Sequence, residues 1–195
     1  IISGEGGAVL VNAADFIAQA EVIREKGTDR AKFFRGEVDK YTWQTIGSSF
    51  LPSDITAAFL WGQLEDAASL IRRRLAIWNR YHQAFDSLEA RGLVVRPTIP
   101  DHCQHNGHIY YLILPERRAR DKMLSALKSA GVGAIFHYVP LHSSPAGKEY
   151  GRAAAGLPHT DRVSDCLVRL PIWVGMAGAE IDHVISAVEA SAVSL

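Results

Sequence analysis

The feature that most constrains this chain is a long apolar stripe with helical spacing. Ser53 is a candidate N-cap, and Asp54 places a carboxylate in the first helical turn. Apolar residues then recur every three or four positions up to Gly92. They are Ala57, Leu60 or Trp61, Leu64, Ala68, Ile71, Leu75, Trp78, Phe85 and Leu88. This spacing predicts one continuous amphipathic helix with a single buried face.

The loop that leads into this helix, Gly47-Ser48-Ser49, is a candidate anion site. A loop before a helix presents free backbone N–H groups and the positive end of the helix dipole, and such a site can hold a phosphate. The alternative is structural, because any long core helix begins in the same way. The spacing alone leaves both interpretations open.

Composition places the chain among ordinary globular proteins. It has 195 residues, 48% of them hydrophobic, and the 21 basic side chains balance the 21 acidic ones. This balance gives no reason to expect nucleic acid or an anionic membrane as a partner. No apolar run has the length of a membrane span, and two cysteines are too few for a disulfide framework, so we expect a cytoplasmic protein. The chain opens on Ile-Ile-Ser-Gly without a methionine, which is typical of the interior of a longer protein.

The first residues predict a glycine-rich turn at 4–7, a short buried strand at 8–11, and a helix over 13–26. In this helix Asn12 is the cap, Phe16, Ala20 and Ile23 face inward, and Gly27 is the end. Residues 28–45 follow without periodicity and are rich in aromatic and charged side chains. Such a segment suits a subunit interface, or recognition of a phosphorylated or ringed ligand.

The prolines that follow Gly92 indicate a domain boundary near residue 92. Beyond it, the pattern predicts strands at 109–114, 134–138 and 169–172, with helices at 116–130 and 181–193. Strands that alternate with helices indicate a small α+β or α/β domain.

Two groups of histidines are candidate sites. His102, Cys103, His105 and His108 resemble a metal cluster, but their spacing fits no standard zinc pattern, so we expect no metal. The second group is the run from His137 to His142, HYVPLH, at the end of a predicted strand. Side chains there either line a site or make ordinary hydrogen bonds at a domain seam.

Four stretches together resemble the DegT/StrS-type sugar-nucleotide aminotransferases. They are GEGG (4–7), GSSFLPSDITAAFLWGQL (47–64), HYVPLH (137–142) and RLP (169–171), and they occur in the family's order. More narrowly, REKGTDR (24–30) and FFRGEVDKYTW (33–43) look like the dTDP-4-amino-4,6-dideoxygalactose transaminases, which act in surface polysaccharide synthesis.

The resemblance implies an α/β protein, the C-terminal part of a pyridoxal-phosphate-dependent transferase with the aspartate aminotransferase fold (fold type I). Residues 1–92 would be the end of the large cofactor domain, with its long helix, and 93–195 a small α+β C-terminal domain. The implied protein is a cytoplasmic homodimer that binds pyridoxal 5'-phosphate. It moves an amino group from glutamate to C4 of a dTDP-4-keto-6-deoxyhexose, with neither nucleic acid nor membrane as partner. The family's Schiff-base lysine would lie upstream of Ile1, so we expect no catalytic residue in this chain and little activity from it alone.

The resemblance also implies site residues. Ser49 stands where many members have an asparagine that reaches the cofactor phosphate, so we predict a cofactor contact there. Arg35, Lys40, Tyr41 and Trp43 are predicted to contact the substrate or the neighbouring subunit. His137, Tyr138 and His142 are predicted to line the sugar side of the cleft. We also expect residues 33–43 to be poorly ordered, or packed on a neighbouring copy, in a structure of this chain alone, because they have no periodic face with which to pack on their own domain.

Two alternatives remain at this stage. A few relatives of these enzymes are sugar dehydratases that carry histidine in place of the lysine. The chain can also be a folded interaction or dimerisation fragment without activity.

Overall fold

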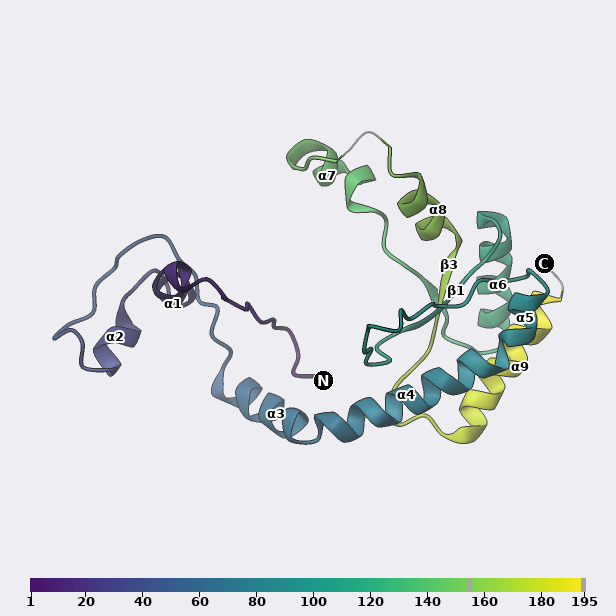
Figure 1. Ribbon diagram of the computed structural model, residues 1–195, viewed down its shortest axis with the longest axis horizontal. Coiled ribbons are helices and arrows are strands. Elements are labelled where there is room, and N and C mark those ends of the chain that lie inside the picture. The colour runs from purple at the N-terminus through teal and green to yellow at the C-terminus, as the bar shows by residue number, and fades with distance from the viewer. Residues whose placement is uncertain (154–155, 194–195) are drawn as a thin grey trace. The chain divides into compact units, whose positions relative to one another are not determined.

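The computed structural model describes residues 1–153 and 156–193 and contains two compact units, Ile1–Ala67 and Ala68–Leu195 (Figure 1). The structure is mixed helix and sheet, as the sequence predicted, and its sheet belongs to the second unit. The predicted boundary near residue 92 concerns the large and small domains of a longer protein and stays a prediction. No helix in the part of the chain that the structure describes is long and apolar enough to cross a membrane.

The predicted single helix consists of three: α3 (Asp54–Glu65), α4 (Ala67–Ala84) and α5 (Asp86–Ala90). As predicted, Ser53 caps α3, where its side chain accepts a hydrogen bond from the Thr56 N–H at 3.2 Å. The helical run ends at Gly92, whose φ of +71° lies in the left-handed region that glycine adopts without strain. The prediction of one continuous helix was wrong because the backbone leaves helical geometry at Asp66 and again at Phe85.

The prediction of one continuous buried face was also wrong. Side chains from α4 and α5, among them Trp78, Tyr81 and Leu88, are buried in the second unit. Helix α3 buries no side chain, and most of its residues are exposed, as Ile55 and Phe59 illustrate. The apolar residues of α3 itself are distributed around the whole helix, whereas those of α4 lie mainly on one face.

The first unit also contains the short 3-10 helix η1 (Ala14–Phe16), α1 (Ile17–Arg24) and α2 (Arg30–Phe34). The strand predicted at 8–11 does not form, since Val9 and Leu10 are exposed and these residues pair with no other described segment. The predicted helix over 13–26 is shorter at both ends. Asn12 does not cap it, and Phe16 is exposed rather than inward.

A three-stranded antiparallel sheet forms the centre of the second unit. Its order is β1-β3-β2, from β1 (Tyr110–Ile113), β3 (Leu167–Leu170) and β2 (Ile135–Phe136). In the register, Tyr110 pairs with Leu170 and Phe136 with Val168. The strand predicted at 169–172 is therefore displaced by two residues, and the one predicted at 134–138 is shorter, because residues 137–140 leave the sheet and run into a loop.

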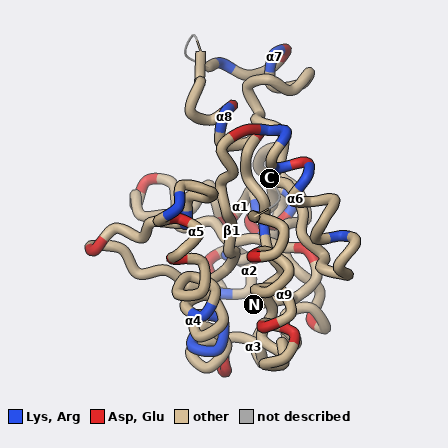
Figure 2. The backbone as a smooth tube through the Cα atoms, turned by 90° about the vertical axis from the view of Figure 1, so that its right-hand side faces the viewer, with Lys and Arg blue, Asp and Glu red and all other residues tan. Residues whose placement is uncertain are grey.

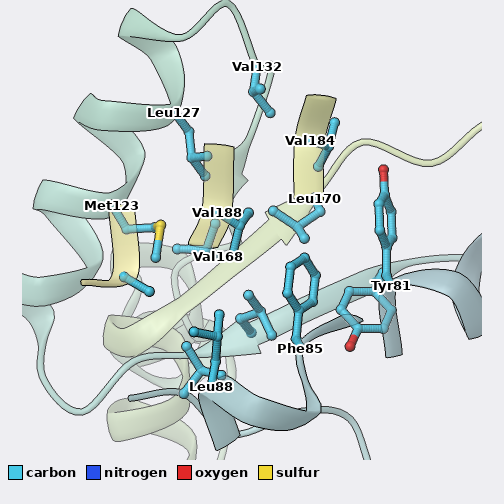
Figure 3. Close-up of a cluster of buried hydrophobic side chains, with 14 of the residues drawn as sticks. Tyr81, Phe85, Leu88, Met123, Leu127, Val132, Val168, Leu170, Val184 and Val188 are labelled. Atoms are coloured by element: carbon cyan, nitrogen blue, oxygen red, sulfur yellow. The ribbon is translucent and has the colours of Figure 1, made fainter. Parts of the chain in front are cut away.

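Helices α6 (Arg117–Ser129), α8 (Pro158–Cys166) and α9 (Gly178–Ala192) of this unit bury side chains. The 3-10 helix η2 (Leu141–Ser143) and α7 (Pro145–Tyr150), which follows it, bury none. Helix α6 packs against α8, α9 and β3. Figure 3 shows the shared core, in which Met123 and Leu127 of α6 and Val188 of α9 lie around Val168 of β3. Phe85, in the turn between α4 and α5, extends the same core (Figure 3).

Consecutive arginines near the start of α4, visible as a blue run in Figure 2, hold loops of the second unit. Arg73 donates to the Val174 carbonyl at 2.8 Å. Arg74 donates to the carbonyls of Gly107 and His108. These bonds fix the segment that enters β1 and the turn that follows β3. Arg73 and Arg74 therefore stabilise the fold of the second unit by hydrogen bonding to its loops.

Candidate functional site

The predicted site residues fall in both units. Ser49, Arg35, Lys40, Tyr41 and Trp43 belong to the first, and His137, Tyr138 and His142 to the second.

Backbone hydrogen bonds hold the loop before α3 against the end of α1. Ser48 donates to the Ile23 carbonyl and accepts from the Lys26 N–H, each at 3.0 Å. The approach is close enough to require glycine, since a Cβ at Gly47 would lie 2.1 Å from the Gly27 nitrogen. The GSS sequence is therefore a structural requirement of this crossing as well as a candidate ligand site.

Ser49 lies at this crossing and forms an antiparallel bridge with Glu25. Ser49 is exposed, and its hydroxyl has no hydrogen-bond partner among the residues that the structure describes. The backbone is thus fixed while the hydroxyl remains available as a donor. This arrangement fits one hydrogen bond to a cofactor phosphate, although the helix N-terminus beside it is already occupied by the Ser53 cap.

The aromatic segment 33–43 folds back on itself. The Phe33 ring contacts the rings of Phe34 and Tyr41, with centroid distances of 5.8 and 5.7 Å. The guanidinium of Arg30 lies over the Phe34 ring at 5.0 Å. At the base of the segment, Asp29 accepts from the Thr42 N–H at 2.6 Å. The expectation that these residues have no means of packing on their own unit was therefore wrong.

Arg35 is held by two carboxylates. It donates to both oxygens of Glu21 at 2.6 and 2.9 Å, and its Nε donates to Glu37 at 2.6 Å. These hydrogen bonds lower the pKa of Glu21 and Glu37 and raise that of Arg35. The two carboxylates outnumber the one guanidinium, so the cluster as a whole presents no free positive charge to a ligand.

The other predicted residues of this loop are more available. Among the described residues, Lys40 makes neither an ion pair nor a side-chain hydrogen bond. Tyr41 is half exposed, and Trp43 is 76% exposed although its Nε1 donates to the Thr45 carbonyl at 2.6 Å. The loop therefore presents one free ammonium group beside two aromatic faces.

In the second unit, the HYVPLH segment borders a cavity of about 620 Å³. The walls come from the first turns of α6, from residues 136–143 and from α8. Arg117, Arg120 and His137 face this cavity, as do Asp121, Asp161 and Asp165. Five of these acidic and basic side chains are already paired, because Arg117 approaches Asp165 at 3.7 Å, Arg120 approaches Asp121 at 3.1 Å, and Asp161 binds His142.

The three predicted residues of this segment have different environments. His137 is half-buried, and its Nδ1 is buried with no hydrogen-bond partner among the described residues. Tyr138 is 75% exposed and its ring lies under the guanidinium of Arg169. His142 contacts Asp161 through Nε2 at 3.0 Å. His137 therefore lines the cavity, whereas Tyr138 and His142 are not among its lining residues, and His142 contacts the α8 wall through Asp161.

Residues of the His102–His108 group make packing and hydrogen-bond contacts within the second unit. His105 packs edge-on against Trp78, with ring centroids 4.6 Å apart, and the carbonyl of His108 accepts from Arg74. Within residues 1–153 and 156–193, no group of three or more His, Cys, Asp or Glu side chains is arranged to hold a metal ion.

Sequence reasoning missed Glu21, Glu37 and Asp161, which partner the predicted residues Arg35 and His142. Glu37 is two residues from Arg35, so local spacing could have suggested that pair. Glu21 and Asp161 are 14 and 19 residues from their partners, and no periodic signal connects them.

Comparison with known proteins identifies the family of this chain. The sequence profile of the DegT/DnrJ/EryC1/StrS aminotransferase family matches residues 1–189. The chain belongs to this family. The fold is that of the pyridoxal-phosphate-dependent aminotransferases, and the matching region covers every site residue considered above.

Individual relatives agree. The uncharacterized protein MJ1066 of Methanocaldococcus jannaschii is 28% identical over 97% of this chain and 50% of its own length. The spore coat polysaccharide biosynthesis protein SpsC of Bacillus subtilis is 26% identical over 96% of the chain and 50% of its length. The crystal structure of the sugar aminotransferase CalS13 from Micromonospora echinospora superposes with a TM-score of 0.78 at 22% identity, over 96% of this chain and 48% of that one. The chain therefore spans about half the length of the curated relatives it matches.

Proposed function

We propose that this chain is the C-terminal part of a pyridoxal-phosphate-dependent sugar-nucleotide aminotransferase. Its amino donor would be glutamate and its acceptor C4 of a dTDP-4-keto-6-deoxyhexose, for surface polysaccharide synthesis. The observation that carries the proposal is the family match over residues 1–189. The resemblance of FFRGEVDKYTW to the dTDP-4-amino-4,6-dideoxygalactose transaminases supports the narrower substrate.

The cofactor, when bound, supplies the electron sink that lets an amino group pass between two carbonyl compounds. From this chain, the exposed Ser49 hydroxyl would donate one hydrogen bond to the cofactor phosphate, with its backbone fixed against α1. We assign no residue of this chain to the Schiff-base role, which the resemblance gives to a lysine upstream of Ile1.

Each unit carries candidate contacts for the nucleotide sugar. The free ammonium group of Lys40 suits its diphosphate, and the exposed faces of Tyr41 and Trp43 suit a ring. In the second unit, His137 at the cavity and the exposed Tyr138 would contact the sugar, and His142 would hold the α8 wall through Asp161. Each assignment rests on the chemistry within its own unit.

Helix α3 supports a homodimer. A helix that is apolar on all sides is found buried, yet Trp61 is 66% exposed and Phe59 56% exposed here. Further protein surface is needed to cover it, and the second subunit of a homodimer would supply part of that surface.

The proposal is tested on the complete polypeptide that contains this chain. We expect it to convert glutamate to 2-oxoglutarate only when a dTDP-4-keto-6-deoxyhexose is present, with the amino sugar identified by mass spectrometry. Release of water from the sugar without consumption of glutamate would instead identify a dehydratase. An absence of both reactions, together with no absorption band from lysine-bound cofactor, would favour a non-catalytic fragment or interaction protein.

Two substitutions test the assigned residues. Ser49→Ala should weaken cofactor binding roughly threefold to tenfold, since one neutral hydrogen bond contributes about 0.5–1.5 kcal/mol. Lys40→Met should raise KM for the nucleotide sugar by roughly tenfold and leave KM for glutamate unchanged, because only the sugar carries the diphosphate. The exposed Lys128, at the end of α6, provides the control Lys128→Met. Equal effects of Lys40→Met and Lys128→Met would remove Lys40 from the site.

A further inference from the structure

Arg35 is the most strongly bound cation of the first unit. Its guanidinium makes four hydrogen bonds, two to Glu21 and two to Glu37, at distances from 2.6 to 3.3 Å. A guanidinium has five N–H donors, so few remain for another anion. A phosphate that bound Arg35 directly would have to displace a carboxylate or bring a third anionic group to the cluster, which like-charge repulsion opposes.

The two carboxylates lie on different parts of the fold. Glu21 belongs to α1, whereas Glu37 follows the turn at Gly36, which has a φ of +73°. Arg35 itself stands just after the last residue of α2. The cluster therefore ties α1 to the point where the chain leaves α2 and enters the segment that carries Lys40.

A second set of hydrogen bonds anchors the C-terminal end of the same segment. Asp29 accepts from the Thr42 N–H at 2.6 Å and from the Gln44 side chain at 2.9 Å. The Gly27 carbonyl accepts from the Gln44 and Thr45 N–H groups at 2.7 and 3.1 Å. Residues 38–41, which include Lys40, thus lie between two points that are anchored to the region of α1 and α2.

We propose that Arg35 is a positioning residue, which acts through Glu21 and Glu37 to fix the loop of residues 36–43 and so presents Lys40 to the diphosphate of a nucleotide sugar. The part that concerns the ligand rests on the proposed function. The part that concerns the loop rests on the hydrogen bonds alone. Direct binding of phosphate by Arg35 is the competing role, and it makes the opposite prediction for Glu21.

The test compares Glu21→Gln, Arg35→Gln and the double variant in the complete protein. If Arg35 is a positioning residue, both single substitutions speed backbone hydrogen exchange in residues 36–43 by roughly 1.5-fold to fivefold, the range expected from loss of an exposed charged contact. Both raise KM for the nucleotide sugar with little change in kcat. The double variant is no worse than Arg35→Gln, because the two residues act as one unit.

The substitution Glu65→Gln provides a matched control, since Glu65 is an exposed glutamate of the same unit, at the end of α3, and makes no ion pair among the described residues. It should leave exchange in residues 36–43 at the wild-type rate. The proposal is overturned if Glu21→Gln leaves exchange unchanged, or if it tightens nucleotide-sugar binding while Arg35→Gln abolishes it, because Arg35 would then be a direct ligand. If the wild-type protein binds no nucleotide sugar, the proposed function fails, while the exchange measurement still decides the positioning role.

Discussion

Leu88 offers a sharp test of whether α5 belongs to the core of the second unit. Its side chain is 2% exposed and lies in the buried cluster with Phe85 and Val94 (Figure 3). The substitution Leu88→Ala removes three carbon atoms from a site that its neighbours cannot fully refill. Buried Leu→Ala changes lower the free energy of unfolding by about 3–5 kcal/mol. With a urea m-value of about 2 kcal/mol/M, the unfolding midpoint should fall by about 1.5–2.5 M.

The matched control is the same chemical change at Leu141 in η2, where the side chain is 83% exposed. Leu141→Ala should alter the free energy of unfolding by no more than about 0.5 kcal/mol. Urea unfolding followed by circular dichroism measures both. If Leu88→Ala fails to fold, Leu88→Met keeps the volume and should cost less than about 1.5 kcal/mol. Similar midpoints for Leu88→Ala and Leu141→Ala would show that α5 does not pack on the sheet.

Two further predictions concern pH and backbone geometry. Burial, with a contribution from Arg96, lowers the pKa of His82 below its ordinary value of 6.5. The stability that neutral His82 contributes is therefore complete above about pH 6.5 and is lost as the pH falls through the lowered pKa. The urea midpoint of His82→Phe should consequently fall less between pH 7 and pH 5 than that of the wild-type protein. Parallel curves for the two proteins would contradict this. Gly47→Ala should destabilise the first unit by more than about 1 kcal/mol, because its Cβ would lie 2.1 Å from backbone. Gly62→Ala, in α3 with open space around it, should stabilise by about 0.5–1 kcal/mol, and the same sign of thermal shift for both variants would refute the argument.

Local chemistry explains what the sequence predicted well. The Ser53 cap and the left-handed glycines that end helical runs, Gly92 and Gly131, depend on neighbouring residues alone. The helix predicted at 116–130 is α6, and the strand predicted at 109–114 contains β1, because their apolar periodicity reflects the core that they face. The family assignment has the same origin, since motifs in a fixed order are properties of the sequence.

Contacts between distant residues explain what the sequence did not predict. Apolar spacing gave one stripe through α3, α4 and α5, but spacing carries no information about what covers each turn. Side chains of α4 and α5 are buried in the core of the second unit, whereas α3 buries none. Likewise, composition predicted an unsupported aromatic loop at 33–43. Glu21, 14 residues before Arg35, supplies the missing support.

The sequence by itself therefore determined the Ser53 cap, the main elements of the second unit and the family of the protein. Tertiary structure decided which charges are free. Arg35 and Lys40 are equivalent cations in the sequence, yet α1 brings Glu21 to Arg35 and brings no carboxylate to Lys40 in the part of the chain described here. A side chain's charge is fixed by its chemistry, whereas its availability to a ligand depends on which residues the fold places beside it.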